Sequence, residues 1–228
     1  MNLVQHSLFE QAVLFLAAMV LFVSMLMLVQ TKLSRLIGLF AGQGFMLAAV
    51  AAITAYSLPY HHLYWSAAIT LVMKAVLIPW MLLKLIHQME MQHEEETLLY
   101  PAHILGPGAA SLALFSYSVV LPIEQLSTLA TRNTIAISLA VVLLGMLLMI
   151  VRRQAVAHVV GFMAIENGLF FAAVSATRGM PMVVELGIAF DVLVAAVIFG
   201  VFFFHIRTSI DSLDVDRLNR LSEVEVDS

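Results

Sequence analysis

Seven long apolar runs, separated by short polar segments, dominate the chain. They cover approximately residues 7–29, 35–57, 63–87, 103–121, 134–151, 156–176 and 183–206. A helix needs roughly 20 apolar residues to cross about 30 Å of hydrocarbon. The runs are continuously apolar rather than alternating, which favours helices over the strands of a β-barrel. The pattern therefore predicts an all-α integral membrane protein with about seven transmembrane helices.

Prolines interrupt two of these runs. The stretch "GPG" at 106–108 makes the fourth run the weakest, and we expect its helix to start irregularly or with a kink. Pro79 lies within the third run. A helical proline there leaves the carbonyl of Ala75 without its usual partner, so we expect a kink.

The composition supports the membrane class. Of 228 residues, 62% are hydrophobic and 11% are charged, whereas a soluble domain carries about 25% charged residues. Cysteine is absent, which excludes disulfides, Cys-based zinc sites and Cys-ligated iron–sulfur clusters in this chain. The net charge of −4 comes mostly from residues 90–96 and 211–228, and neither acidic segment indicates nucleic-acid binding. No Lys or Arg precedes the first run, which is too long for a typical signal peptide, so we expect it to be a retained span.

The basic residues predict the orientation of the spans. One set of loops, with the C-terminal tail, holds eight of them: Lys32, Arg35, Lys84, Arg152, Arg153, Arg207, Arg217 and Arg220. The other set, with the N-terminus, holds Arg132 and Arg178. Positive residues are enriched in cytoplasmic loops, so we expect the N-terminus outside and the C-terminus in the cytoplasm.

The two halves of the chain resemble each other. Aligning "LVQTKLSRLIGLFAGQGFMLAAVAA" (28–52) with "MIVRRQAVAHVVGFMAIENGLFFAAVSA" (149–176) pairs Gln43 with Glu166, and the following spans pair Lys74 with Asp191. Two parallel three-helix repeats joined by a fourth helix would produce this pattern. The expected organisation is a 3+1+3 arrangement: a first repeat with an acidic cytoplasmic loop (1–101), a linking helix (102–132), a second repeat (133–207) and an acidic cytoplasmic tail (208–228).

Four polar side chains lie in the middle of the predicted spans: Gln43, Lys74, Glu166 and Asp191. Glu166 and Asp191 are each roughly 12–15 Å from the ends of their helices, near the middle of the bilayer. An intramembrane charge is costly and usually faces the protein interior or a water-filled cavity. A carboxyl group avoids that cost by taking up a proton, so these two residues are candidates for proton transfer, with Lys74 as a third.

Structural roles compete with this interpretation. A protonated acid also bonds neighbouring helices together, and Lys74 could be a structural ion-pair partner. Gln43 cannot ionise, so we expect it to support the site by positioning water or bonding across helices. Gly38 and Gly42 form a GxxxG motif, which permits close helix approach but is common by chance.

Other candidate sites are weaker. His87, Glu90, His93 and Glu94 stand at helical spacing that could bind a metal, but a solvated helix end explains them better. His158 and His205 could ligate a haem, although histidines near the ends of membrane spans are ordinary. We find no self-contained active site, and we expect no metal or cofactor in this chain.

The polar pattern within the last three spans resembles a known group of membrane subunits. The stretches "LLGMLLMIVRRQAVAHVVGFMAIENGLFFAAV" and "LGIAFDVLVAAVIFGVFFFHIRTSIDSLDVDRLNRL" resemble the three-helix K subunit of complex I and the C subunit of Mrp-type cation/proton antiporters. The seven-span length and "MKAVLIPW" (73–80) resemble more closely component E of hydrogenase-4. The resemblance is strongest over about residues 134–221.

This resemblance implies functional residues and partners. Glu166 matches the first membrane carboxylate of the family and Asp191 the second. The K subunit usually has glutamate at both positions, so Asp191 departs from the pattern and has a shorter reach. The implied partners are antiporter-like membrane subunits and a peripheral arm with nickel–iron and iron–sulfur centres, in a bacterial or archaeal plasma membrane.

The sequence leaves three functions open. The first is a proton-translocating subunit of a complex-I-like [NiFe]-hydrogenase or related respiratory complex. The second is a subunit of a cation/proton antiporter or of an inorganic-carbon transport assembly. The third is a scaffold that conducts no ions.

Overall fold

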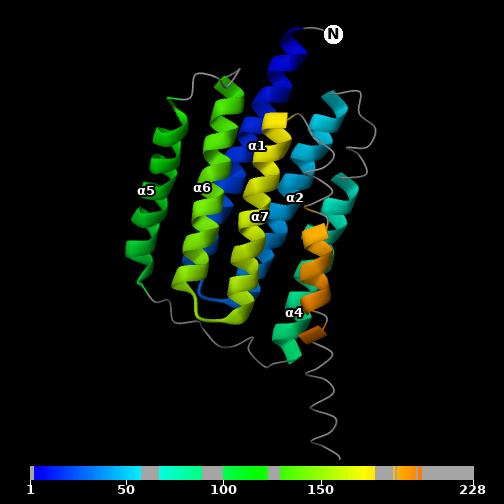
Figure 1. The fold of residues 1–228 in the computed structure, drawn as a ribbon, viewed down its shortest axis with the longest axis vertical. Helices are drawn as coiled ribbons and strands as arrows, with labels where there is room; N and C mark the ends of the chain where they lie inside the picture. Colours follow the sequence, from blue (N-terminus) through cyan, green and yellow to red (C-terminus); the bar gives the residue numbers. More distant parts are fainter. Residues whose placement is uncertain are drawn as a thin grey trace, which may run out of the picture.

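The structure of the protein is a computed structural model. It describes residues 3–57, 67–88, 100–122, 129–177, 187, 189–198 and 200–201. The described elements are the helices α1 (Leu3–Val29), α2 (Leu33–Ser57), η1 (Leu71–Leu77), α4 (Ile78–Gln88), α5 (Ala102–Val120), α6 (Leu129–Val151) and α7 (Ala155–Thr177), as Figure 1 shows. No β-strand occurs within these ranges. The predicted all-α class is therefore confirmed.

Six helical segments are long and apolar enough to cross a membrane. They are Glu10–Val29, Leu33–Tyr56, Ala67–His87, His103–Val120, Thr131–Val151 and Ala155–Val174. A seventh, shorter apolar helix covers Ala189–Ile198, inside the predicted run 183–206, and most of the rest of that run lies outside the described residues. The chain is a multi-pass membrane protein, and the six long segments match the first six predicted runs.

The helices form two hairpins that pack against each other. α1 and α2 make the first hairpin and α6 and α7 the second, while α1 contacts α6 and α2 contacts α7. α5 covers the outside of α6, and η1 and α4 pack against α2 (Figure 1). Large apolar side chains fill the interior between the hairpins, among them Phe40 and Phe171, both fully buried. This packing brings the middles of α2, η1 and α7 together.

Arg152 ties the two hairpin turns to the same end of the bundle. Its buried guanidinium donates to the carbonyls of Met27 (3.1 Å) and Leu28 (3.4 Å) and to that of Gln30. The last carbonyls of a helix have no partner within the helix, and a basic side chain at this end satisfies them. The basic loops after α1 and after α6 therefore share one face, as the predicted orientation requires (Figure 1).

Glycines allow the closest helix contact, between α6 and α7. An added Cβ would lie 2.8 Å from a side-chain carbon of Ile165 at Gly145, and 2.6 Å from one of Met149 at Gly161. At Gly168 it would lie 3.0 Å from the carbonyl of Ser138 on α6. No close contact forms at the GxxxG motif, because a Cβ at Gly38 or Gly42 would meet no described atom within 4 Å.

The two prolines have different effects. α5 runs continuously through Pro107, so the irregular start expected there is not observed. Pro107 lies close to the beginning of α5, where only one backbone bond is lost. Before Pro79 the chain widens instead: η1 is a π-helical segment, and the N–H of Ile78 donates to the carbonyl of Met73, five residues earlier. The irregularity observed next to Pro79 is therefore a wider helical turn that contains one extra residue.

We predict that Gly168→Ala destabilises the protein while Gly38→Ala does not. The added methyl group at Gly168 would stand 2.8 Å from Val142 Cγ2 and 3.1 Å from its backbone nitrogen. Overpacking of this kind costs typically 1–3 kcal/mol. At Gly38 the space is open, and alanine is favoured over glycine within a helix by up to about 1 kcal/mol. Unfolding in detergent micelles measures both changes; equal effects would contradict the proposed packing.

Candidate functional site

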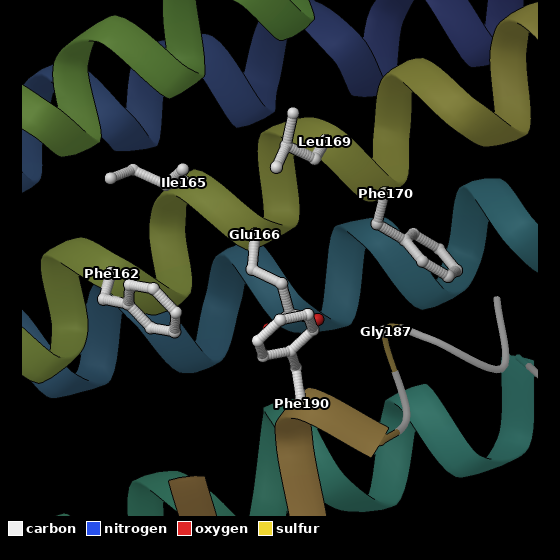
Figure 2. A pocket seen from close by; sticks show the side chains of 7 residues that line it. All are labelled: Phe162, Ile165, Glu166, Leu169, Phe170, Gly187 and Phe190. Atoms are coloured by element: carbon white, nitrogen blue, oxygen red, sulfur yellow. The ribbon is translucent and has the colours of Figure 1, made fainter. Parts of the chain in front are cut away.

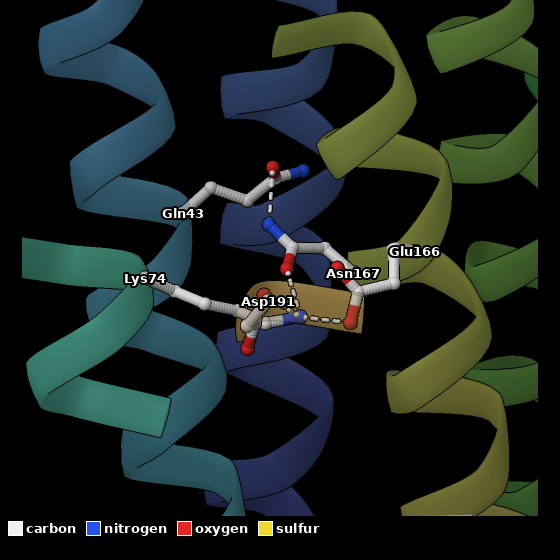
Figure 3. Close-up of polar contacts among 5 residues, drawn as sticks. All are labelled: Gln43, Lys74, Glu166, Asn167 and Asp191. Carbon is white, nitrogen blue, oxygen red and sulfur yellow. Dashed lines mark hydrogen bonds and ion pairs between the residues drawn. The ribbon is translucent and has the colours of Figure 1, made fainter. Parts of the chain in front are cut away.

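The four polar residues singled out in the sequence lie in one interior cluster. Gln43 comes from α2, Lys74 from η1, Glu166 from α7 and Asp191 from the helix Ala189–Ile198 (Figure 3). The structure adds a fifth member, Asn167, which follows Glu166 on α7. All five side chains are buried. The cluster is therefore an interior site shared by four helical segments.

Lys74 occupies the centre of this cluster. Its Nζ lies 2.8 Å from Glu166 Oε1, 3.0 Å from Asn167 Oδ1 and 3.6 Å from Asp191 Oδ1. The ring of Phe170 packs on the same ammonium group, with its centroid 5.5 Å from Nζ, which adds a cation–π contact. An ammonium has three hydrogens to donate and nothing to accept with. Two of these oxygens accept hydrogen bonds from Nζ and the third lies nearby, which suits a side chain that can only donate.

A chain of hydrogen bonds leads from Lys74 across three helices. The amide of Asn167 donates to Gln43 Oε1 (3.0 Å), and the amide of Gln43 donates to the hydroxyl of Ser24 on α1 (2.9 Å). Ser24 in turn donates to the carbonyl of Val20, at 2.8 Å. Each polar group of this chain has a partner, so its burial is compensated.

The charges of the cluster do not balance when all its groups are ionised. One ammonium faces two carboxylates, Glu166 and Asp191, and the excess is one negative charge. Among the described residues, Glu166 Oε2 and Asp191 Oδ1 are buried and accept no hydrogen bond. An uncompensated charge is costly in a buried site and in a membrane. The arrangement is neutral when the two carboxyl groups hold one proton between them.

An apolar cavity adjoins Glu166 (Figure 2). Its volume is about 200 Å³, and it is lined by Phe162, Ile165, Glu166, Leu169, Phe170, Gly187 and Phe190. The rings of Phe162 and Phe190 meet edge to face, with centroids 6.3 Å apart. Apart from the one carboxyl group the lining is apolar. Glu166 therefore stands between a polar centre and an apolar cavity.

Sequence reasoning missed two members of the site, Asn167 and Ser24. Asn167 directly follows Glu166, and an amide beside an intramembrane acid is a signal that could have found it. Ser24 carries no comparable signal, because a serine hydroxyl commonly bonds the carbonyl one turn earlier in its own helix, as Ser24 also does.

The weaker candidates that the structure describes, His87 and His158, are not among the residues that contact Lys74. His158 Nδ1 bonds the carbonyl of Gln154, at 2.9 Å, near the start of α7. Its proposed haem partner, His205, lies outside the described residues. Of the possible metal ligands, His87 is exposed near the end of α4, and Glu90, His93 and Glu94 also lie outside the described residues.

Comparison with known proteins finds distant relatives of nearly the same length. The chain is 28% identical over 209 residues to an uncharacterized protein of Mycobacterium tuberculosis, covering 92% of this chain and 95% of the relative. It is 26% identical over 185 residues to hydrogenase-4 component E of Escherichia coli, covering 81% and 85%. The match to the protein of that name in Shigella flexneri has the same extent. No family profile and no solved structure matches the chain. Hydrogenase-4 component E is thus a distant homologue.

We predict that Gly44→Ala disturbs the site while Gly42→Ala does not. A Cβ at Gly44 would lie 3.0 Å from the carbonyl carbon, the oxygen and the Cβ of Lys74, whereas one at Gly42 would meet nothing within 4 Å. The backbone of η1 must then shift and move Nζ away from its oxygens. We expect a loss of about 1–3 kcal/mol in unfolding free energy.

A double-mutant cycle with Lys74→Met tests this explanation. Part of the loss in Gly44→Ala should vanish when the ammonium is already absent, giving a coupling energy above about 0.5 kcal/mol. Strict additivity of the two changes, measured by unfolding in detergent, would show that Gly44 does not act through Lys74.

Proposed function

We propose that this chain is a membrane subunit of a multisubunit hydrogenase-type complex and that it moves protons through Glu166, Asp191 and Lys74. The observation that carries the proposal is the buried ammonium held between two carboxyl groups. The distant homology to hydrogenase-4 component E supports the kind of complex. We found no other acid–base centre in the described interior that joins three helical segments in this way.

Proton exchange follows from the charge of this centre. One proton makes the three groups neutral together, and the position of the ammonium decides which carboxyl group holds it. Nζ is closer to Glu166 than to Asp191, 2.8 Å against 3.6 Å, and Coulomb attraction falls with distance. This arrangement favours ionised Glu166 and protonated Asp191. A shift of Nζ towards Asp191 would reverse the preference.

The partners in this proposal are those implied by the resemblance. Antiporter-like membrane subunits would continue the proton path, and a peripheral arm with nickel–iron and iron–sulfur centres would supply the driving reaction. A cation/proton antiporter or an inorganic-carbon transport assembly would lack that arm. Purification of the native complex with identification of its subunits separates these alternatives.

The contacts also support our proposal that the chain contains two copies of a three-helix unit. Under the alignment, α1 corresponds to α6 and α2 to α7, and each of these pairs packs together. Lys74 and Asp191, which the alignment pairs, lie in contact. Parallel copies related by an axis along the membrane normal would bring equivalent positions together in this way.

We expect Glu166→Gln to assemble normally and to impair proton transfer. The amide still accepts a hydrogen bond from Lys74, and Lys74 and Asp191 then form a neutral pair that holds no exchangeable proton. Loss of a positioned acid or base lowers such rates by about 10²-fold or more. Proton uptake into vesicles that contain the assembled complex measures the effect, with subunit content checked by mass spectrometry. Glu166→Asp keeps the acid and should be milder.

The matched control is Glu10→Gln, which removes an exposed acid of α1 and should leave uptake unchanged. A scaffold without an ion path makes the opposite prediction for Glu166→Gln, because glutamine packs and bonds like a protonated glutamate. Normal uptake by fully assembled Glu166→Gln complexes would refute the proposed relay.

The orientation is a further prediction. The shared face of the basic loops and the eight-to-two distribution of basic residues support a cytoplasmic C-terminus. A reporter that is active only in the cytoplasm should give a signal when fused to Ser228. Activity of a reporter that works only outside the cytoplasm, fused at the same position, would reverse the assignment.

A further inference from the structure

We propose that Asn167 is a positioning residue: it holds the Lys74 ammonium against α7 and thereby decides which carboxyl group carries the proton. This inference rests on the proposed exchange of a proton between Glu166 and Asp191. It assigns a role to a residue whose side chain bonds Lys74 and Gln43 and acts on the two carboxyl groups through Lys74.

Two of the three oxygens around Nζ come from neighbouring residues of α7. Glu166 and Asn167 offer acceptors at 2.8 Å and 3.0 Å, and both distances are those of good hydrogen bonds. Asp191 offers one oxygen, at 3.6 Å, which is beyond that range. Asn167 therefore adds a second α7 bond that favours the ammonium position near Glu166.

The donor-only character of Lys74 fixes the direction of the whole amide chain. Because Nζ can only donate, Asn167 must present its oxygen to it and its nitrogen to Gln43. Gln43 must then present its oxygen to Asn167 and its nitrogen to Ser24, whose hydroxyl donates to Val20. The chain ends on a backbone carbonyl of α1, which anchors the orientation of every amide between it and the ammonium.

This chain holds a position and carries no protons. Each amide nitrogen donates one of its hydrogens along the chain and has no free lone pair to receive a proton, so a proton cannot pass along it in the way it passes along water. The exchange is thereby confined to the two carboxyl groups beside Lys74. Removal of Asn167 should release Nζ from α7 without opening a new path.

Infrared difference spectroscopy of the assembled complex, recorded in H₂O and D₂O, tests the inference. Protonated carboxyl groups give a C=O band that ionised ones lack. The band belongs to this pair if it disappears with Asp191→Asn and with Glu166→Gln, because each change leaves one ammonium and one ionised carboxyl group. Isotope labelling then shows which residue holds the proton: in the otherwise native protein the band should move to lower frequency when aspartate carries ¹³C in its side-chain carboxyl group. In Asn167→Leu, which keeps the size of the side chain but removes its oxygen, the ammonium can move towards Asp191. The band should then move with labelled glutamate instead.

Two further variants distinguish the specific effect of Asn167 from a general loss of structure. Asn167→Ser is small and well tolerated between membrane helices, yet its side chain is too short to reach Nζ, so it should shift the proton as Asn167→Leu does. Ser24→Ala removes a group that is also buried but stands three hydrogen bonds from Nζ, and it should leave the proton on Asp191.

The outcomes separate the two proposals. A band that still moves with labelled aspartate in both Asn167 variants overturns the role of Asn167 and leaves the proton exchange intact. A native spectrum with no band dependent on either Glu166 or Asp191 overturns the shared proton, and the proposed function with it. A shift in Ser24→Ala as large as in Asn167→Leu shows general loosening of the site and likewise overturns the specific role.

Discussion

The buried ammonium of Lys74 is the charge around which the centre of this molecule is organised. A lysine that is 1% exposed inside a membrane protein requires oxygens on every side that it faces. Two neighbouring segments supply oxygens directly to the ammonium: α7 through Glu166 and Asn167, and Ala189–Ile198 through Asp191. The third segment, α2, contributes through Gln43, whose oxygen accepts a hydrogen bond from Asn167. Removal of any of these segments would leave a buried charge with too few partners, so the charge specifies the packing as much as the packing buries the charge.

Close helix contact and the polar centre depend on each other. Gly44 brings α2 against the backbone of η1, and Gly168 brings α7 against α6 directly beyond Asn167 in the sequence. Glycines at these positions remove the side chains that would hold the helices apart. Hydrogen bonds of 2.8–3.0 Å tolerate little displacement, so the small residues set the distances on which the polar contacts rely.

Much of this arrangement could be predicted from the sequence, and the limits have physical causes. Long apolar runs identify the spans because only helices satisfy their own backbone in lipid, and polar residues such as Glu166 stand out against them. The contacts of Asn167 could not be predicted, because they depend on which face of α7 meets α2. The GxxxG motif at Gly38 carries little information for the same reason: small residues permit close contact, but the packing of the whole bundle decides where contact occurs.

The π-helical segment η1 also bears on how the two halves of the chain can be compared. A π turn accommodates one residue more than an α turn, and that residue displaces everything after it by about 100° around the helix axis. Side chains before and after Leu71–Leu77 therefore do not follow a single helical periodicity. Suppose that the equivalent span of the other half is an α-helix throughout. An alignment without a gap then pairs residues that face the same direction either before η1 or after it, but not in both parts. Evolutionary comparison of this span should allow for one inserted residue, because the insertion changes the direction in which the later side chains point.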